Sequence, residues 1–218
     1  RVLFRSMLKV AFPTGIEAKT ATYDIAFGDI ARPNDGHENV ALKWCDVSSD
    51  KGGVTILNDC KHAYDVKDGV VRLTLLRSSY SPDPTPDIGM HQMRYARLDH
   101  AGPLDKAAVV RAGWEFNKPM RVLVVDWRAD SGTHPGVWAG CEAGPANVIV
   151  TALKRSEDND DVILRAYECT GAPASATITL GLDATWAREV DLRERDMEAT
   201  RPVGGEGRTL TLAFKPYE

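Results

Sequence analysis

Short β-favouring runs separated by turn signals are the feature of this sequence that most restricts its fold. The expected strands are residues 7–12, 22–27, 40–44, 54–57, 70–76, 93–98, 122–127, 148–154, 162–168, 176–180, 189–192 and 210–214. Runs of this length and spacing are typical of antiparallel sheets. Within "VVRLTLLR", Val71, Leu73 and Leu75 alternate with Arg72 and Thr74, the period of a strand with one buried face. The sequence therefore predicts a mainly all-β protein.

One segment has the periodicity of a helix instead. Apolar residues recur every four positions from Leu104 to Phe116, with Pro103 before the run and Pro119 after it. Proline is tolerated in the first turn of a helix and ends a helix elsewhere. We therefore expect one short helix over residues 104–117.

Two further stretches indicate connections. Residues 129–146 are rich in Gly, Pro, Ser and Thr, which predicts a linker or a long crossing loop. Beyond it, Asp158, Asp160 and Asp161 lie between two expected strands. They lack the glycine and the distal glutamate of an EF-hand calcium loop, so we interpret them as a solvated hairpin turn.

Composition and charge argue against two classes of partner. The chain of 218 residues is 43% hydrophobic and 27% charged, which suits a soluble globular protein with a buried core. Its net charge is −4 and its Lys and Arg are scattered, so we expect no nucleic-acid partner. No apolar run approaches the ~20 residues that span a bilayer, so we expect no membrane partner. Residues 1–12 do not resemble a secretory signal, which favours a cytoplasmic location.

Sequence motifs for nucleophilic, phosphate-binding or metal chemistry are absent. The chain has no G-x-S-x-G elbow, P-loop, G-x-G-x-x-G turn or H-E-x-x-H helix, and its histidines never share the spacing of a two-histidine metal site. The cysteines form no C-x-x-C pair. We predict reduced, mostly buried thiols at Cys45, Cys60, Cys141 and Cys169, and no metal site.

A dense polar cluster follows the expected strand 54–57. It contains Asn58, Asp59, Lys61, His62, Tyr64 and Asp65. Asn and Asp after a strand are typical turn formers, so one interpretation is an exposed turn. The other is a binding loop, because amide, carboxylate, ammonium, imidazole and phenol groups together suit a hydroxyl-rich ligand such as a sugar. The residues alone leave both interpretations open.

A second polar loop precedes residue 93. Three prolines within "SPDPTPDIGMHQM" predict an extended irregular segment that carries Asp83, Asp87 and His91. Loops commonly hold binding residues, but Asp also caps turns and His also serves in local hydrogen bonds. Both roles are compatible with this sequence.

Several stretches, in order along nearly the whole chain, resemble one known family. They are "MLKVAFP" (7–13), "ATYDIAFG" (21–28), "KWCDVS" (43–48), "ILNDCKHAYDV" (56–66), "LTLLRS" (73–78), "NVIVTALKRSED" (147–158) and "ILRAYE" (163–168). The chain resembles the C-terminal region of glycoside hydrolase family 38, the α-mannosidases, in particular the bacterial and cytosolic type. It departs from the family pattern at His62 and Ala63, where Tyr and Gly are usual.

The resemblance implies a division into domains. Residues 1–128 would be the later part of a mutarotase-like supersandwich, residues 129–146 a linker or crossing loop, and residues 147–218 a small C-terminal β-sandwich. The family's catalytic aspartate and zinc ion belong to an N-terminal α/β barrel, whose motifs are absent here. We therefore expect no catalytic residue, metal or cofactor in this chain, and no hydrolysis of mannosides by it alone.

The resemblance also gives the polar cluster a role. The supersandwich of the family packs on the barrel and lends loop residues to the mannose site. By this likeness, Asn58, Asp59, Lys61 and His62 are the expected substrate-binding residues. The expected partners are the chain's own N-terminal catalytic barrel and mannoside glycans. An unpaired sheet edge would also permit a homo-oligomer.

Two other functions are compatible with the residues. One is a free-standing carbohydrate-binding module that uses exposed Trp138 or Trp186. The other is a mutarotase-like epimerase, in which His91 would act with Glu115 or Glu38 as general acid and base. No spacing in the sequence supports that second arrangement.

Overall fold

The computed structural model describes residues 5–79, 81, 83, 85–122, 124, 139–202 and 207–218. The chain divides into two compact units, Arg1–Pro119 and Met120–Glu218. Each unit is built from antiparallel strands, and each has its own core. The expectation of a mainly all-β protein with sandwich-type sheets is therefore confirmed.

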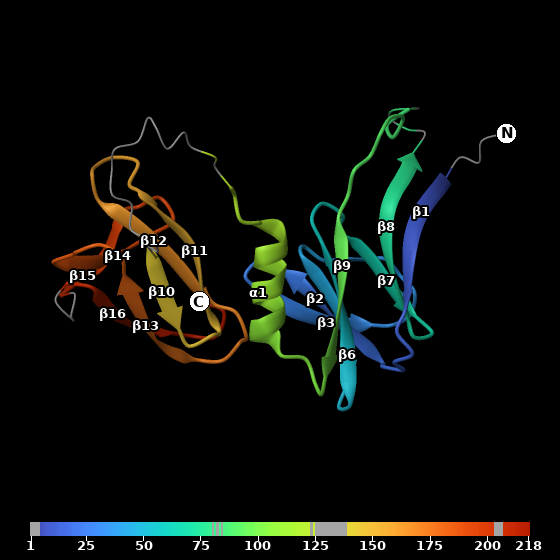
Figure 1. Ribbon diagram of the computed structural model, residues 1–218, viewed down its shortest axis with the longest axis horizontal. Helices are drawn as coiled ribbons and strands as arrows, with labels where there is room; N and C mark the ends of the chain where they lie inside the picture. Colours follow the sequence, from blue (N-terminus) through green and yellow to red (C-terminus); the bar gives the residue numbers. More distant parts are fainter. Residues whose placement is uncertain are drawn as a thin grey trace. The chain divides into compact units, whose positions relative to one another are not determined.

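The first unit contains two sheets (Figure 1). The four-stranded sheet has the order β1 (Arg5–Pro13), β8 (Val70–Ser79), β7 (Ala63–Lys67), β4 (Asn39–Val40). The five-stranded sheet has the order β3 (Gly28–Pro33), β2 (Thr20–Ile25), β5 (Trp44–Ser49), β6 (Gly52–Asn58), β9 (Tyr95–Ala101). Alternate residues of each strand share a face, which explains how strands with charged members still build a common core.

The core of the first unit combines side chains of both sheets. The five-stranded sheet contributes Tyr23, Cys45 and Ile56, and the four-stranded sheet contributes Tyr64 and Leu73, all of them fully buried. The alternation predicted for residues 70–77 thus places its apolar members in this core. Burial of such side chains, at about 1.5–3 kcal/mol each, is the main favourable contribution to folding.

Helix α1 (Lys106–Asn117) covers part of the other face of the five-stranded sheet. Asp105 caps it by accepting a hydrogen bond from the Ala108 N–H at 3.1 Å. A β-carbon on Gly113 would lie 3.1 Å from the Trp44 ring, so the absence of a side chain there lets the helix lie close to β5. The expected helix is confirmed, with Asp105 rather than Pro103 at its start.

The described residues of the second unit form three small sheets. Three strands have the order β10 (Cys141–Gly144), β13 (Ala174–Leu180), β16 (Thr209–Phe214), and two hairpins are β11 (Val148–Arg155) with β12 (Val162–Glu168) and β14 (Trp186–Val190) with β15 (Asp196–Pro202). Its buried apolar side chains include Val148, Tyr167, Ala176, Ile178 and Leu180. Strands β10 and β11 lie against each other.

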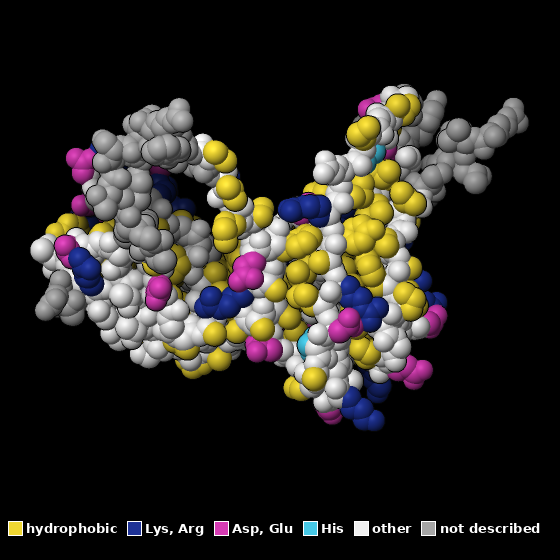
Figure 2. Space-filling model, in the orientation of Figure 1, with side chains coloured by type: hydrophobic (Ala, Val, Ile, Leu, Met, Phe, Trp, Pro, Cys, Tyr) yellow, Lys and Arg dark blue, Asp and Glu magenta, His cyan; other side chains and the backbone are white. Residues whose placement is uncertain are grey.

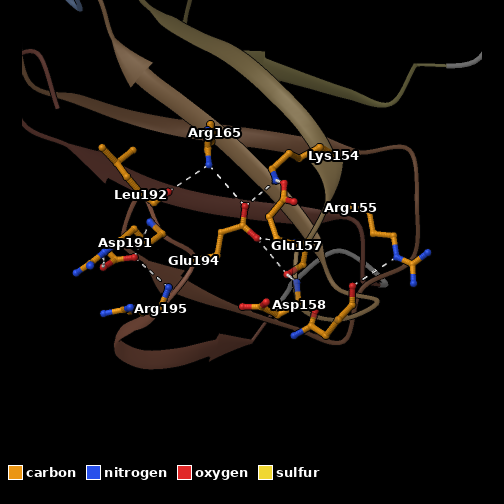
Figure 3. A network of polar contacts seen from close by, with 12 residues as sticks. Lys154, Arg155, Glu157, Asp158, Arg165, Asp191, Leu192, Glu194 and Arg195 are labelled. Carbon is orange, nitrogen blue, oxygen red and sulfur yellow. Dashed lines mark hydrogen bonds and ion pairs between the residues drawn. The ribbon is translucent and has the colours of Figure 1, made fainter.

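A buried carboxylate connects the turns of the two hairpins in the second unit (Figure 3). Glu194, in the β14–β15 turn, accepts hydrogen bonds from the Ser156 hydroxyl at 3.1 Å and the Glu157 N–H at 2.9 Å. It also pairs with the Lys154 ammonium at 2.8 Å. These donors lower the pKa of Glu194 to about 2, with the Lys154 hydrogen bond as the largest cause.

The expected elements differ from the observed ones in several places, and the strands β3, β10 and β15 were not expected at all. Residues 40–44 do not form one strand: β4 ends at Val40 and β5 begins at Trp44. The polar cluster after Asn58 is shorter than expected, because β7 begins at Ala63. The strand expected at 122–127 falls mainly outside the described residues. Single-sequence patterns locate strand boundaries poorly because tertiary pairing decides them.

The expected domain bounds can be compared only in part. Most of the predicted linker 129–146 lies outside the described residues, but β10 occupies Cys141–Gly144 at its end. The predicted acidic hairpin turn is confirmed: β11 and β12 pair on either side of it, and the Ser156 N–H donates to the Asp161 carbonyl at 2.8 Å. The bounds 1–128 and 147–218 stay a prediction.

Candidate functional site

The polar cluster forms a tight turn between β6 and β7, and the side chain of Asn58 holds this turn together by hydrogen bonds. Its side chain is only 1% exposed. Its Nδ2 donates to the Leu42 carbonyl at 3.1 Å and to the Tyr64 hydroxyl at 2.7 Å, while its Oδ1 accepts from the Lys61 N–H at 2.8 Å. Because both amide donors are used, the oxygen already accepts one hydrogen bond and the residue is buried, Asn58 shapes the turn rather than facing a ligand.

Asp59 connects the turn to the start of β9. Its carboxylate accepts from the Arg94 N–H and from the Arg94 Nε, each at 3.0 Å. The Asp59 N–H in turn donates to the Arg94 carbonyl at 3.2 Å. Burial alone would raise the pKa of Asp59, but hydrogen bonds from Cys60 and Arg94 hold that pKa below its ordinary value. The carboxylate is therefore ionised and occupied by Arg94 at neutral pH.

Lys61 and His62 are the members of the turn whose polar ends remain available. His62 is exposed, and its Nδ1 lies 3.1 Å from the Leu42 carbonyl, which leaves Nε2 for another partner. Lys61 is half-buried, and within the described part of the chain no ion pair or side-chain hydrogen bond involves its ammonium. The turn thus holds one unpaired cation and one imidazole nitrogen.

Ala63, where the family pattern has Gly, adopts a backbone conformation that suits alanine. Glycine at this position would suggest a positive φ, which alanine tolerates poorly. Ala63 instead begins β7 in extended conformation and is not among the described residues with positive φ. Alanine therefore fits the backbone conformation at this position without strain.

The remaining two members of the polar cluster, Tyr64 and Asp65, are buried on β7. The Tyr64 hydroxyl donates to the Ile56 carbonyl at 3.3 Å. The Asp65 carboxylate pairs with the Lys9 ammonium at 2.6 Å and with Arg72 at 2.5 Å. Because successive side chains of a strand point to opposite faces, Tyr64 lies in the core and Asp65 lies on the opposite face of β7, where Lys9 and Arg72 cover it. The sequence pattern alone could not separate them from the exposed members.

The C-terminal end of α1 lies against the same turn. Asn117 Nδ2 donates to the Asn58 carbonyl at 2.9 Å. Nearby, the Lys43 ammonium pairs with Asp24 at 3.0 Å and lies 4.8 Å from the centre of the Trp114 ring. Burial raises the pKa of Asp24 despite the attraction of Lys43. The turn is thus supported by β6, β9 and α1, which makes its position well defined.

Arg94 is the residue of this site that sequence reasoning missed. It lies 35 residues from Asp59, and only the pairing of β9 with β6 brings the two together. No local motif surrounds it. A single arginine before an expected strand carries no signal without the tertiary pairing.

The other polar loop does not support the epimerase arrangement. His91 Nε2 lies 2.9 Å from the Asp87 carbonyl of its own loop, and Asp83 accepts from the Thr85 N–H at 2.8 Å. Glu38 is paired with Lys9 at 3.1 Å on the four-stranded sheet. Each of these groups therefore has a local structural partner.

The tryptophans proposed for a carbohydrate-binding module are only partly described. Trp138 lies outside the described residues. Trp186 is 44% exposed, and the guanidinium of Arg188 lies 5.2 Å from the centre of its ring. This contact takes up ring surface on which a sugar would stack.

The described residues contain no group of His, Cys, Asp or Glu arranged to hold a metal ion. Four cysteines are free; Cys45 and Cys169 are buried, whereas Cys60 is exposed and Cys141 is partly exposed. The prediction of mostly buried thiols thus holds for two of them. Among the described helices, none is long and apolar enough to cross a membrane.

Comparison with known proteins decides the family. The family descriptions that match are "Glycosyl hydrolases family 38 C-terminal domain" over residues 4–85 and "Glycosyl hydrolases family 38 C-terminal beta sandwich domain" over residues 147–218. Together the two ranges cover more than half of the chain. The chain belongs to glycoside hydrolase family 38.

Relatives of known name agree with this family. Over 97% of this chain, the human protein named alpha-mannosidase 2C1 is 31% identical, and alpha-mannosidase G of Dictyostelium discoideum is 34% identical over 79%. The solved structure of an alpha-mannosidase from Enterococcus faecalis V583 matches 97% of the chain with a TM-score of 0.75 at 18% identity, a likeness of fold. The chain spans 21% of the human protein's length, 17% of the Dictyostelium protein's and 25% of the solved structure's.

Proposed function

We propose that this family 38 chain is the C-terminal, non-barrel part of a retaining α-mannosidase that hydrolyses terminal α-mannosides in the cytoplasm. In this proposal, the turn that carries Lys61 and His62 lends polar groups to the mannose site of a neighbouring catalytic barrel. The observation that carries the proposal is the ammonium of Lys61, which has no partner among the described residues and lies on a turn that Asn58 and Asp59 already hold.

The chemistry of Lys61 suits a sugar. An ammonium offers three hydrogen-bond donors and no acceptor, so it bonds to hydroxyl oxygens, and its charge strengthens each bond. A turn fixed by Asn58 and Asp59 would place that ammonium without a large loss of conformational freedom on binding. Asn58 and Asp59, expected from the sequence as ligand contacts, thus act in the proposal as supports of Lys61.

Bond breaking in this proposal belongs to residues outside the chain. A retaining glycosidase needs a carboxylate nucleophile and an acid–base carboxyl group across the scissile bond. We place both in the catalytic barrel, together with the zinc ion expected there. The described residues of this chain do not fit a zinc ion, and we derive no step through it. Lys61 binds and orients the sugar.

An exposed apolar surface supports a neighbouring domain as partner. Figure 2 shows hydrophobic side chains gathered around β9 and β1. Of the exposed large apolar residues on these strands, Leu8 and Tyr95 face the space between the two sheets, whereas Met7 and Leu98 point to the opposite faces of their strands. Apolar patches of this kind commonly mark interaction sites. In the longer protein, we assign this surface to the partner domain.

Replacement of Lys61 tests the proposed function. In the full-length protein, Lys61→Ala should lower kcat/KM for an α-mannoside about 100-fold, which corresponds to about 2.7 kcal/mol of lost transition-state stabilisation. The melting temperature should not change, because the Lys61 side chain has no described partner to lose. Steady-state kinetics and thermal unfolding measure the two quantities.

Lys67→Ala is the matched control. Lys67 ends β7, the strand that follows the turn, and is exposed. Its loss should leave kcat/KM unchanged. Full activity of Lys61→Ala would show that the turn has only a structural role. An equal loss of activity in Lys61→Ala and Lys67→Ala would show that the effect comes from removing a positive charge, whatever its position.

A further inference from the structure

Arg94 makes contacts on two sides of the candidate turn. On one side its backbone N–H and its Nε hold the Asp59 carboxylate, each at 3.0 Å. On the other side its Nη2 donates to the Phe116 carbonyl at 3.3 Å, and its guanidinium carbon lies 5.3 Å from the centre of the Phe116 ring. One side chain therefore joins the turn to the last residues of α1.

The shape of the guanidinium explains why this contact can fix a position. Arginine presents its N–H donors in a rigid planar fork and stacks on aromatic rings, whereas a lysine ammonium is a flexible point charge. Here one arm of the fork meets Asp59 while another meets the helix carbonyl, and the ring of Phe116 limits rotation. The Asp59 carboxylate consequently has one orientation relative to α1.

The same contact contributes little to global stability. The Arg94 side chain is 51% exposed, and ion pairs that exposed are screened by solvent. The turn, however, holds Lys61 only two residues after Asp59. A weak contribution to folding and a direct connection to Lys61 are the properties of a positioning residue.

We propose that Arg94 is a positioning residue for Lys61: by holding Asp59 against the end of α1, it fixes the turn from which Lys61 reaches the sugar. The inference rests on the proposed function of Lys61. Arg94 itself touches neither sugar nor reacting atoms. It acts through the backbone of residues 59–61.

A double-mutant cycle in the full-length protein tests this role. Arg94→Gln should lower kcat/KM for an α-mannoside about 10-fold, and Arg94→Lys should recover part of the loss because it keeps the charge beside Asp59. In a Lys61→Ala background, Arg94→Gln should have no further effect, since the group that it positions is gone. An additive loss in that background would overturn the proposal.

Arg97→Gln provides the control. Arg97 lies on β9 as well, is 39% exposed, and pairs with Asp99 at 2.7 Å rather than with the turn. Its replacement removes an exposed arginine ion pair of the same kind and should not change kcat/KM. A loss equal to that of Arg94→Gln would assign the effect to β9 in general and overturn the proposal.

Hydrogen exchange separates this inference from the proposed function. In the full-length Arg94→Gln variant, the peptide that contains Lys61 should exchange its amide hydrogens about 10-fold faster, with an unchanged melting temperature. Unchanged exchange would overturn the positioning role whatever the kinetics show. If Lys61→Ala keeps full activity while Arg94→Gln still accelerates exchange, the proposed function fails and Arg94 is shown to hold the turn.

Discussion

At the scale of single residues, Glu168 is a buried carboxylate held by many hydrogen bonds. Its side chain is fully buried at the end of β12. It accepts from the Asn147 amide at 2.9 Å and from the N–H groups of Thr170, Gly171 and Tyr217 at 2.7, 2.8 and 3.2 Å. Burial alone would raise its pKa, but hydrogen bonds from the Thr170 hydroxyl, the Thr170 and Tyr217 N–H groups and Asn147 lower the pKa to about 2. The motif "ILRAYE" thus ends in a carboxylate that organises three separate segments.

We predict that Glu168→Gln destabilises the chain by about 3 kcal/mol at pH 7, because an amide group then faces N–H donors in a buried site. The folded pKa lies below the ordinary value of 4.5, so this stabilisation is present above pH 4.5 and is lost as the pH falls towards about 2. Urea unfolding at several pH values should show the difference between wild type and variant shrink over that interval. Exposed Glu142 gives the control Glu142→Gln, and a difference that is independent of pH would contradict the prediction.

At the scale of elements, the contact between α1 and β5 depends on Gly113. A β-carbon there would lie 3.1 Å from the Trp44 ring and 3.3 Å from the Lys43 β-carbon. Trp44 is fully buried, so its ring has little room to move. The helix that supports the candidate turn therefore requires the smallest residue at this position.

We predict that Gly113→Val destabilises the chain by about 1–3 kcal/mol through overpacking, although valine has a higher helix propensity than glycine. Ala108→Val places the same side chain on the exposed face of α1 and should cost only about 0.6 kcal/mol. Chemical denaturation measures both values. Equal values for the two variants would mean that packing against Trp44 is not tight.

At the scale of the whole molecule, the chain spans only a part of the length of its relatives. Human alpha-mannosidase 2C1 is matched over only 21% of its length. We therefore predict that the purified 218-residue chain shows no α-mannosidase activity above buffer, even with added zinc, because its described residues form no metal site. A chromogenic α-mannoside with the full-length protein as positive control measures this. Turnover by the isolated chain that survives further purification would refute the prediction.

The sequence by itself determined the secondary-structure class, the helix, the acidic hairpin and the family, because these depend on local periodicity and contiguous motifs. Only the tertiary structure decided which members of the polar cluster face inward. Asn58 and Asp65 are as polar as Lys61 in the sequence, but β6 and β7 bury them among protein partners. The pairing of Asp59 with Arg94 across 35 residues was likewise invisible, since strand register, and no local pattern, brings the two side chains together.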